Sequence, residues 1–432
     1  MLPQRSVTRK TPGFETREPD MNVLQINFSD YAQGGGGAIA MHRLYLGLKK
    51  SGVPCKILSG TKTLASPDSE AIPRSVKIES LVRRGTVKLG LNDIHCVSSF
   101  SIKHHPFYRE AEIVNFHVIH SGFFNYLAIP GLTKSKPAVF TLHDMWGFTG
   151  HCAYSYDCER WKIGYGACPY PDSYPAIRSD HTHWEWKLKN WMAHHSNLTI
   201  VTPSRWLTEK VSQSMFKRLP VYHIPNGIDT TVYQPLERKK CRVALELPMN
   251  KWVLMFGAAS LADARKGGDL LLKALETLPT SVKTDTILLT FGDQGKGLAQ
   301  EIGMPSLNLG YVTSDDQKAV AYSAADLFIF PTRADNLPLV LQESMACGTP
   351  MVSFNVGGVP DLVRPGITGY LARANDTDDL SQGIVRLLED QPLRERMAHQ
   401  CRSIAVEEYA LERQASQYLQ LYQRIIANLK DP

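Results

Sequence analysis

Two successive sets of short apolar, β-rich runs, each alternating with helix-like segments, constrain the fold of this chain more than any other feature. Such alternation is typical of parallel sheets covered by helices. A segment with the turn residues Pro225, Asn226 and Gly227 separates the sets and reads as a linker. We therefore predict an α/β protein with two domains. The predicted strands are residues 23–27, 113–116, 138–142 and 198–201 in the first set, and 252–257, 287–292, 327–330 and 351–354 in the second.

Composition places the chain among soluble globular proteins, with 43% hydrophobic and 21% charged residues in 432. The net charge of +6 suits anionic substrates or an anionic membrane surface. No basic stripe interleaved with aromatics is present, so nucleic acid is not an expected partner. No apolar run reaches the about 18–20 residues that span a bilayer.

Cellular location is predicted from the first segment and the cysteines. Residues 1–20 are polar and lack the apolar core of a signal peptide, so we expect a disordered extension there. Eight cysteines without a secretory signal favour a reducing compartment. We expect a cytoplasmic protein that can contact the inner face of the cell membrane peripherally.

Glycines and cations follow two predicted strands. A glycine run that includes Gly35 and Gly36 comes after the first strand and before a helical pattern, where the backbone can approach a ligand closely. After the strand that ends at Gly257, Arg265 and Lys266 precede a helix start. An arginine fork and a lysine point charge beside a helix start suit a diphosphate.

The stretch from Asp335 to Glu343 follows a predicted buried strand, residues 327–330. It reads as a loop and then the first turns of a helix, and in α/β proteins ligands bind at such junctions. The helix start offers free N–H groups to a phosphate. Carboxylates at both ends of the stretch can accept hydrogen bonds from sugar hydroxyls. His143 ends another predicted strand, so it should face the same crevice.

These motifs resemble those of retaining glycosyltransferases of family 4, which have the GT-B fold. The stretch from Asp335 to Glu343 is similar to the E-x7-E signature, with Asp335 in place of the first Glu, and residues 224–229 match the I-P-N-G-I-D tag at the domain junction. The resemblance covers nearly the whole chain from about residue 21. It implies two Rossmann-like domains facing a central cleft, with a C-terminal helix crossing back to the N-terminal domain.

The resemblance also implies a domain plan. Residues 21–228 would form the N-terminal, acceptor-binding domain, and residues 229–405 the C-terminal domain that binds the nucleotide-sugar. Residues 406–432 would form the helix that packs back, and residues 1–20 would precede the fold.

The resemblance assigns roles to the residues of the stretch. Glu343 would bind the ribose hydroxyls of the donor, and Asp335 would lie near the transferred sugar. The backbone N–H groups of Leu339 and Val340 would face the donor phosphates or the sugar. The usual glycine-rich loop before them is replaced here by residues 336–338.

Further roles follow for the other motifs. Lys266 would neutralise the leaving diphosphate, with Arg265 replacing an arginine that the family usually has a few residues upstream. His143 would lie close to the donor sugar. Gly35 and Gly36 would border the cleft near the donor phosphates. On this pattern His143 and Asp335 are the catalytic candidates, and the other residues bind the donor.

No cofactor or catalytic metal is expected. The sequence has no DXD motif at a plausible strand end, and Lys266 with the helix ends would take the place of a cation. Cys152, Cys158 and Cys168 lie in an aromatic loop where a related subgroup has four cysteines, and Tyr165 stands in the remaining place. Three cysteines with His151 have the donor atoms for a zinc site. Reduced thiols or one disulfide that stiffens the loop are the favoured alternatives.

The predicted function is retaining transfer of a sugar from a nucleotide diphosphate sugar, a UDP- or GDP-sugar, to a hydroxyl acceptor. The acceptor would be a glycan, a lipid-linked or a small molecule, and the family suggests bacterial exopolysaccharide or lipid-linked glycan assembly. Alternatives are a nucleotide-sugar epimerase, a phosphorylase with lysine-linked pyridoxal phosphate, or a non-catalytic scaffold. Binding of nucleoside diphosphate would exclude the scaffold, and a visible absorption band would mark the phosphorylase.

Overall fold

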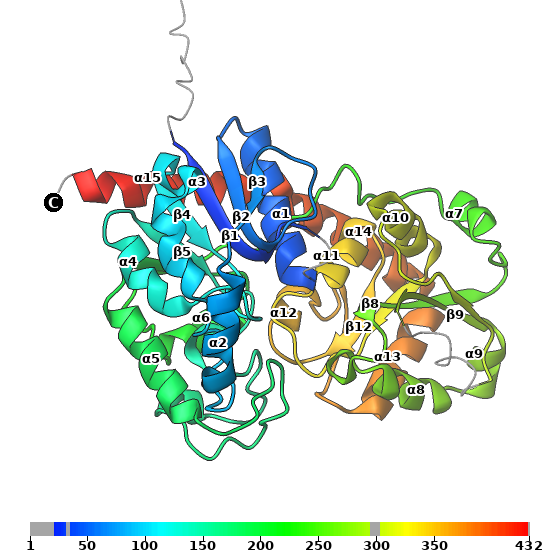
Figure 1. Cartoon of the computed structure of the whole chain (residues 1–432). Helices are drawn as coiled ribbons and strands as arrows, with labels where there is room; N and C mark the ends of the chain where they lie inside the picture. Colours follow the sequence, from blue (N-terminus) through cyan, green and yellow to red (C-terminus); the bar gives the residue numbers. More distant parts are fainter. Residues whose placement is uncertain (1–20, 32–34, 294–302, 431–432) are drawn as a thin grey trace, which may run out of the picture.

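The computed structural model describes residues 21–31, 35–293 and 303–430, and the predicted extension at residues 1–20 lies outside them. The chain forms two halves that lie side by side, each a parallel sheet covered by helices (Figure 1). The fold class is therefore the predicted one. Across the described ranges, no helix has both the length and the apolar character needed to cross a bilayer.

The first sheet has the order β3-β2-β1-β4-β5-β6-β7, and all its strand pairs are parallel. This is a Rossmann-like order, in which the chain turns from one side of the sheet to the other between β1 and β4. Its strands are β1 (Val23–Ser29), β2 (Cys55–Thr61), β3 (Ser69–Ala71), β4 (Ile113–Phe116), β5 (Ala138–Thr141), β6 (Leu198–Thr202) and β7 (Val221–His223).

Helices and 3-10 turns cover both faces of this sheet (Figure 1). They are α1 (Gly35–Lys50), α2 (Val76–Thr86), η2 (Val97–His104), α3 (Pro106–Glu110), η3 (Tyr126–Ala128), α4 (Ile129–Thr133), η4 (Trp146–Phe148), η5 (Arg160–Lys162), α5 (Thr182–His194) and α6 (Arg205–Ser212).

The second sheet repeats this plan with the order β10-β9-β8-β11-β12-β13, again with parallel pairs. Its switch point lies between β8 and β11. The strands are β8 (Trp252–Ser260), β9 (Thr286–Asp293), β10 (Ser306–Asn308), β11 (Leu327–Phe330), β12 (Met351–Phe354) and β13 (Gly369–Ala372). The surrounding elements are α7 (Arg238–Ala244), η6 (Ala264–Lys266), α8 (Gly268–Glu276), α9 (Thr280–Thr284), α10 (Asp315–Ala324), α11 (Leu339–Ala346), α12 (Val359–Leu362), α13 (Thr377–Glu389) and α14 (Gln391–Tyr409).

Each half has its own apolar core. All four residues of β11 and all four of β12 are buried, which explains why these strands read as continuous apolar runs in the sequence. A strand buried on both faces is held firmly by packing. The loops at its carboxyl end can therefore present side chains in defined positions.

The last helix returns to the first half. After α14 ends at Tyr409, Ala410 forms an isolated parallel β-bridge with Ile228 of the linker. The chain then continues as α15 (Leu411–Lys430), which packs along α1 (Figure 1). A Cβ atom on Gly47 would lie 3.1 Å from the Cβ of Ala415, so a glycine allows this close approach of α1 and α15. The prediction of a C-terminal helix crossing back to the first half is confirmed.

Candidate active site

The carboxyl ends of β8 and β11 bring three predicted site residues together. These strands are paired neighbours at the switch point of the second sheet. Arg265 and Lys266 follow β8, and Asp335 follows β11. Because the two strands are parallel, their carboxyl ends lie at the same edge of the sheet, where α/β proteins bind ligands.

Asp335 joins both cations. Its Oδ2 accepts hydrogen bonds from Lys266 Nζ at 2.6 Å and from Arg265 Nη1 at 3.1 Å. Its Oδ1 accepts the backbone N–H of Asn336 at 3.0 Å. The guanidinium of Arg265 also lies over the ring of Tyr154, 5.1 Å from its centroid. Arg265 therefore links Tyr154, in a loop of the first half, to the Asp335 carboxylate of the second half.

Burial and charge compete in this cluster. Burial alone would raise the pKa of the Asp335 carboxyl, but Lys266 and Arg265 outweigh it and lower that pKa. Asp335 is therefore ionised at neutral pH. Burial lowers the pKa of the Lys266 ammonium, although the Asp335 carboxylate opposes this. A partly buried cation held by one carboxylate can also attract a second anion, such as a phosphate.

A glycine allows Lys266 to lie so close to β11. Gly267 has a φ of +76°, and a Cβ atom there would lie 1.9 Å from the carbonyl oxygen of Pro331. Any other residue would meet both the backbone strain and the clash. Gly267 therefore holds the turn of η6 against the end of β11.

The helix start predicted to face the donor is the first turn of α11. The backbone amides of Leu339 and Val340 have no hydrogen-bonded carbonyl among the described residues, as expected for the first turn of a helix. Both residues are partly exposed. The N-terminus of α11 therefore offers free donors and the positive end of its dipole beside the Asp335 loop.

Glu343 lies further along α11 and is buried between the two halves. Its Oε1 accepts a hydrogen bond from Arg43 Nη2 of α1 at 2.7 Å, and its Oε2 accepts one from the Tyr322 hydroxyl at 3.1 Å. Arg43 also packs its guanidinium over the ring of Tyr233, 5.4 Å from the centroid. Burial opposes the charge of Arg43, but the Glu343 carboxylate outweighs it and raises the arginine pKa.

The predicted ribose role of Glu343 stays a prediction. In this structure both carboxylate oxygens have protein partners, so ribose hydroxyls would have to share or replace the contact with Arg43. Arg43 Nη1 has no hydrogen-bond partner among the described residues. A ligand at this place would therefore meet one unused donor beside the carboxylate.

His143 follows β5, as predicted, and its partly buried ring ends a chain of hydrogen-bonded polar groups. Its Nε2 lies 2.9 Å from Nδ1 of His117, and Nε2 of His117 lies 2.6 Å from Oε1 of Gln25. Burial lowers the pKa of His143 to about 4 against the pull of the Asp144 carboxylate, and burial lowers the pKa of His117 as well. Both rings are therefore neutral near pH 7.

The hydrogen bonds from His143 through His117 to Gln25 determine the tautomer of His143. The amide oxygen of Gln25 can only accept, so Nε2 of His117 donates and Nδ1 of His117 accepts. His143 then donates from Nε2, which leaves its Nδ1 as a hydrogen-bond acceptor. A neutral acceptor at the end of β5 suits a ligand hydroxyl, as the predicted place beside a donor sugar requires.

Gly35 and Gly36 lie in the first turn of α1, so the helix begins earlier than the sequence pattern indicated. A Cβ atom at either position would meet no atom within 4 Å, and this turn therefore borders open space. A Cβ atom on the next residue, Gly37, would lie 3.5 Å from the Cβ of His143. The first turn of α1 thus lies beside His143.

Asn336 bridges the two halves next to Asp335. Its side-chain amide donates to the carbonyl of His143 at 3.0 Å, and its Oδ1 accepts from the Ser204 hydroxyl at 2.5 Å. The backbone of Gly358 packs closely against Asn336. A Cβ atom on Gly358 would lie 1.7 Å from the carbonyl oxygen of Asn336, so only glycine fits there. The Asp335 loop is therefore held by residues of both sheets.

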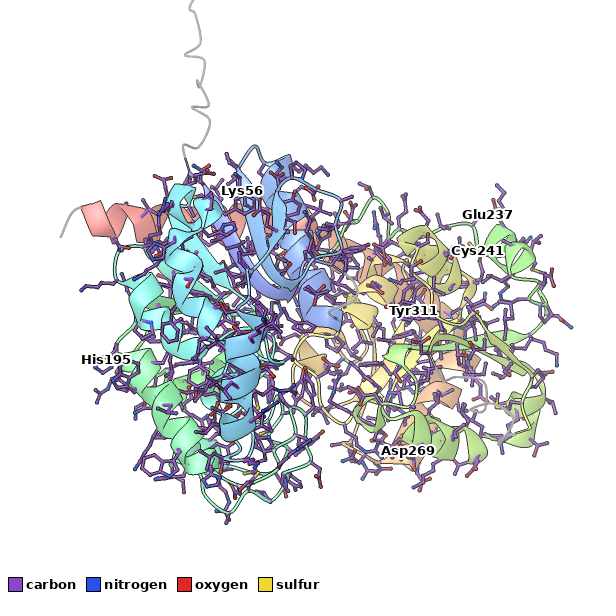
Figure 2. All side chains as sticks on the ribbon, viewed as in Figure 1. Lys56, His195, Glu237, Cys241, Asp269 and Tyr311 are labelled. Carbon is purple, nitrogen blue, oxygen red and sulfur yellow. The ribbon has the colours of Figure 1, made fainter. Side chains whose placement is uncertain are left out.

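A cavity of about 600 Å³ lies between the halves, next to this loop. The first half contributes aromatic side chains from the loop after β5 and from α6, and the second half contributes residues adjacent to Asp335 and to Gly358. Arg333, on the second side, donates to both carboxylate oxygens of Asp269 at 2.8 and 2.6 Å. Asp269 lies at the start of α8 (Figure 2). The lining includes Met145, Tyr154, Tyr156, Tyr170, Trp206, Lys210, Arg333, Ala334, Val356 and Gly357.

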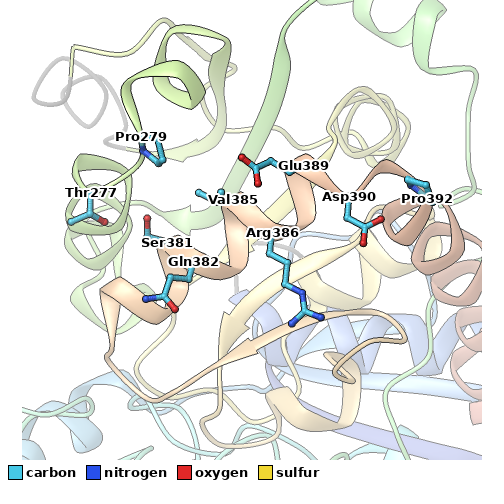
Figure 3. Close-up of a pocket in the computed structure, with 9 residues that line it drawn as sticks. All are labelled: Thr277, Pro279, Ser381, Gln382, Val385, Arg386, Glu389, Asp390 and Pro392. Atoms are coloured by element: carbon cyan, nitrogen blue, oxygen red, sulfur yellow. The ribbon is translucent and has the colours of Figure 1, made fainter.

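A second cavity, of about 700 Å³, lies in the second half, along α13 (Figure 3). Residues of α13 line it together with Thr277 and Pro279, which follow α8. None of the predicted site residues lines either cavity, but Ala334, the residue before Asp335, lines the one between the halves. The cavity between the halves, which meets the Asp335 loop, is therefore the better candidate for substrate.

The cysteine loop shows contacts but no metal-binding cluster. His151 Nε2 lies 3.2 Å from Sγ of Cys168, and Cys152 Sγ lies 3.7 Å from the Tyr165 hydroxyl. Cys152, Cys158 and Cys168 form no disulfide in the structure. Within the described residues, His, Cys, Asp and Glu side chains form no group of three that could hold a metal ion.

Several residues of the site were not anticipated. Arg43 interrupts an apolar helix face that includes Met41 and Leu44, and a buried arginine in such a pattern is a signal for a partner carboxylate. The pair Gly357 and Gly358 after β12 is a similar signal for close backbone contact. No sequence pattern points to His117 or Tyr154, because their roles depend on neighbours far away in the chain.

Comparisons with known proteins agree with this architecture. The model of the family Glyco_transf_4, described as "Glycosyltransferase Family 4", matches residues 34–232, and that described as "Glycosyl transferases group 1" matches residues 237–403. A D-inositol 3-phosphate glycosyltransferase of Mycolicibacterium paratuberculosis is 34% identical over 181 residues. That match spans 40% of this chain and 39% of the relative.

Solved structures show the same fold at low sequence identity. Sucrose-phosphate synthase from Thermosynechococcus elongatus matches with a TM-score of 0.70 at 19% identity, covering 94% of this chain and 100% of that one. HepE of Anabaena in complex with UDP-glucose matches with a TM-score of 0.64 at 15% identity, with coverage of 94% and 100%. Two matching family models in succession and the shared two-domain GT-B fold lead to one conclusion: the chain belongs to the group 1, family 4 glycosyltransferases.

Proposed function

We propose that this glycosyltransferase moves a sugar from a nucleoside diphosphate sugar to a hydroxyl acceptor, with retention of configuration. The observation that carries the proposal is the Lys266–Asp335–Arg265 cluster beside the free N–H groups of α11. Two cations and a helix start can hold a diphosphate, and the carboxylate can stabilise positive charge on the sugar. The HepE structure, solved with UDP-glucose, supports a UDP-sugar as donor, and a GDP-sugar remains the alternative.

In the proposed reaction, the bond between the anomeric carbon and the diphosphate oxygen breaks, and the electron pair leaves with the nucleoside diphosphate. Lys266, Arg265 and the first turn of α11 stabilise the departing charge. The acceptor hydroxyl forms its bond to the anomeric carbon on the same face, and its proton passes to the departing phosphate. No protein base is required, so the contribution of the chain is positioning and charge stabilisation.

Asp335, Glu343 and His143 would each contact a different part of the donor. Asp335 would lie near the anomeric carbon, where positive charge develops. Nδ1 of His143, held as an acceptor by His117, would take a hydroxyl of the sugar. Glu343 would bind the ribose, and Gly35 and Gly36 would border the phosphates. Closure of the two halves would exclude water before transfer.

The test is incubation of the purified protein with a panel of UDP- and GDP-sugars, with nucleoside diphosphate release and products followed by mass spectrometry. We expect nucleoside diphosphate release from one donor class, and a retained anomeric configuration in the product by proton NMR. Interconversion of two nucleotide-sugars without release of nucleoside diphosphate would identify an epimerase instead. No binding of any nucleoside diphosphate would reject the proposal.

The proposal includes independence from a divalent metal, because Lys266 and the helix ends take the place of a cation. Activity should survive incubation with EDTA, measured as nucleoside diphosphate release. Loss of activity that Mg²⁺ or Mn²⁺ restores would contradict this reading. Loss that only Zn²⁺ restores would point to the loop with Cys152, Cys158 and Cys168.

We also propose that the protein works in the cytoplasm, at the inner face of the cell membrane, in exopolysaccharide or lipid-linked glycan assembly. An exposed apolar stripe on α2 supports membrane contact, since Ile78 and Leu81 are 57% and 68% exposed. The cations Lys77, Arg84 and Lys88 flank the stripe in the sequence. Apolar side chains with flanking cations suit an anionic lipid surface.

Vesicle sedimentation tests this contact. Phosphatidylglycerol vesicles should bind the protein, phosphatidylcholine vesicles should bind it weakly, and Ile78→Glu with Leu81→Glu should abolish binding. Val243→Glu is the matched control, because Val243 is 67% exposed on α7 of the other half. Equal binding of all variants would place the contact elsewhere or reject it.

A further inference from the structure

The cavity between the two halves has an aromatic wall, defined here as Tyr154 and Trp206. Their rings are stacked, with centroids 6.5 Å apart and an interplanar angle of 21°. Tyr156 and Tyr170, which also line the cavity, form an edge-to-face pair with centroids 5.7 Å apart. All four rings border one cavity of about 600 Å³, so a ligand in it would contact aromatic side chains.

The aromatic wall is connected to the predicted reaction centre. Arg265 lies over the Tyr154 ring at 5.1 Å and donates to Asp335 at 3.1 Å. Ala334, the residue before Asp335, lines the same cavity. A ligand on the wall would therefore lie next to the carboxylate that is assigned to the transferred sugar.

The nucleotide has a different place. Glu343, Leu339 and Val340, which are assigned to the donor nucleotide and phosphates, do not line this cavity. The cavity is walled by the first half on one side and by the Asp335 loop on the other. It therefore has the position expected for the molecule that receives the sugar.

The charges around the cavity favour a neutral ligand. Arg333 is engaged by both carboxylate oxygens of Asp269. The remaining charged side chains in the lining are the cation Lys210 and the anion Asp157. Asp157 accepts a hydrogen bond from the Tyr170 hydroxyl. One charge of each sign gives no net attraction for an anion. Aromatic faces with few polar groups suit the C–H face of a pyranose ring.

We propose that this cavity binds a neutral pyranose unit of a glycan acceptor, stacked on the Tyr154–Trp206 wall. This inference rests on the proposed transferase function and adds the class of acceptor to it. The phosphate group of a phosphorylated polyol would have no uncompensated pair of cations to bind in this cavity. The acceptor is therefore a sugar chain whose terminal ring is recognised by stacking.

Saturation-transfer difference NMR tests the proposal on the full chain in the presence of UDP. The probes are methyl α-glucopyranoside, methyl β-galactopyranoside, methyl α-mannopyranoside and inositol 3-phosphate. We expect saturation of the ring C–H protons of at least one glycoside and none for inositol 3-phosphate. Trp206→Ala should weaken the glycoside signal about tenfold. Trp184→Ala is the matched control, because Trp184 is 57% exposed on α5 and does not line the cavity.

Two further measurements make the outcome decisive. UDP affinity by calorimetry should be equal in all variants, which shows that they are folded and that the donor site is intact. If Trp206→Ala unfolds, Tyr156→Ser replaces it, since Tyr156 is half-exposed and its loss should also weaken the glycoside signal. An unchanged glycoside signal in the cavity variants, no glycoside contact at all, or binding of inositol 3-phosphate through Trp206 would overturn the inference. Absence of binding of both UDP and GDP to the unaltered protein would instead reject the proposed function.

Discussion

Lys266 shows how one partly buried charge can serve both structure and chemistry. Its ammonium is held by Asp335 at 2.6 Å, and burial lowers its pKa. In the proposed reaction the same ammonium also faces the diphosphate of the donor. A group that acts on both the bound and the departing phosphate should affect binding and turnover together.

Lys266→Ala should raise the KM for the donor and lower kcat. Charge-assisted contacts of this kind contribute roughly 1.5–3 kcal/mol, so kcat/KM should fall about ten- to a hundredfold. Steady-state kinetics of nucleoside diphosphate release measure the change. Lys273→Ala, an exposed lysine on α8, is the control. An unchanged kcat/KM would place Lys266 outside the site.

Asp335 and Glu343 should separate by role. Asp335→Asn should mostly lower kcat while nucleoside diphosphate still binds, because the carboxylate acts where positive charge develops. Glu343→Gln should mostly weaken the affinity for donor and nucleoside diphosphate. Kinetics together with calorimetry for UDP distinguish the two effects. Full turnover in Asp335→Asn, or unaltered nucleotide affinity in Glu343→Gln, would disprove the role of that residue.

Helix α1 carries both a buried and an exposed ion pair, and the two should behave differently. Arg43 pairs with Glu343 across the two halves and is nearly inaccessible. Lys50 on the same helix pairs with Glu412 of α15 at 2.6 Å, with both side chains exposed. Removing one partner of a buried pair leaves an uncompensated charge, whereas water replaces the partner of an exposed one.

Arg43→Met should therefore destabilise the protein by about 3 kcal/mol, measured from the midpoint of urea unfolding. The double variant Arg43→Met with Glu343→Gln should recover part of the loss, because it removes the unpaired charge. Lys50→Ala is the control and should leave the midpoint nearly unchanged. A loss in the double variant as large as in the single one would show that packing, not charge, explains the effect.

The molecule as a whole holds several neutral histidines that are buried or partly buried. Burial lowers the pKa of His42 to about 4 and that of His143 to about 4, and it lowers the pKa of His117 as well. In the unfolded chain these rings titrate near their ordinary pKa of about 6.5. Below that pH the unfolded state binds protons that the folded state does not accept.

The free energy of unfolding should therefore be unaffected by these histidines above about pH 6.5 and should decrease from there toward about pH 4. Each such histidine contributes about 1.4 kcal/mol per pH unit within that window. Denaturant unfolding at several pH values measures the slope. His143→Asn should flatten it. A stability that stays constant between pH 6.5 and 4.5 would contradict the neutral state of these rings.

Much of the fold can be predicted from the sequence, because strands buried on both faces leave continuous apolar runs. Residues 327–330 and 351–354 were predicted with the bounds that β11 and β12 have. Short edge strands such as β7 and β10 were not predicted. Each has three residues that are partly buried or exposed, so their apolar pattern is weak.

The candidate site divides along a similar line. Lys266, Asp335 and Glu343 could be named in advance, because each lies at a strand end or helix start whose position follows from local pattern. Their partners could not be named in advance. Arg43 is 300 residues from Glu343 in the chain, and Tyr154 contacts Arg265 from the other half. Local pattern places a residue on its element. Which side chains then share a buried contact depends on how two separate sheets pack across their interface, and no short-range pattern in the chain encodes that packing.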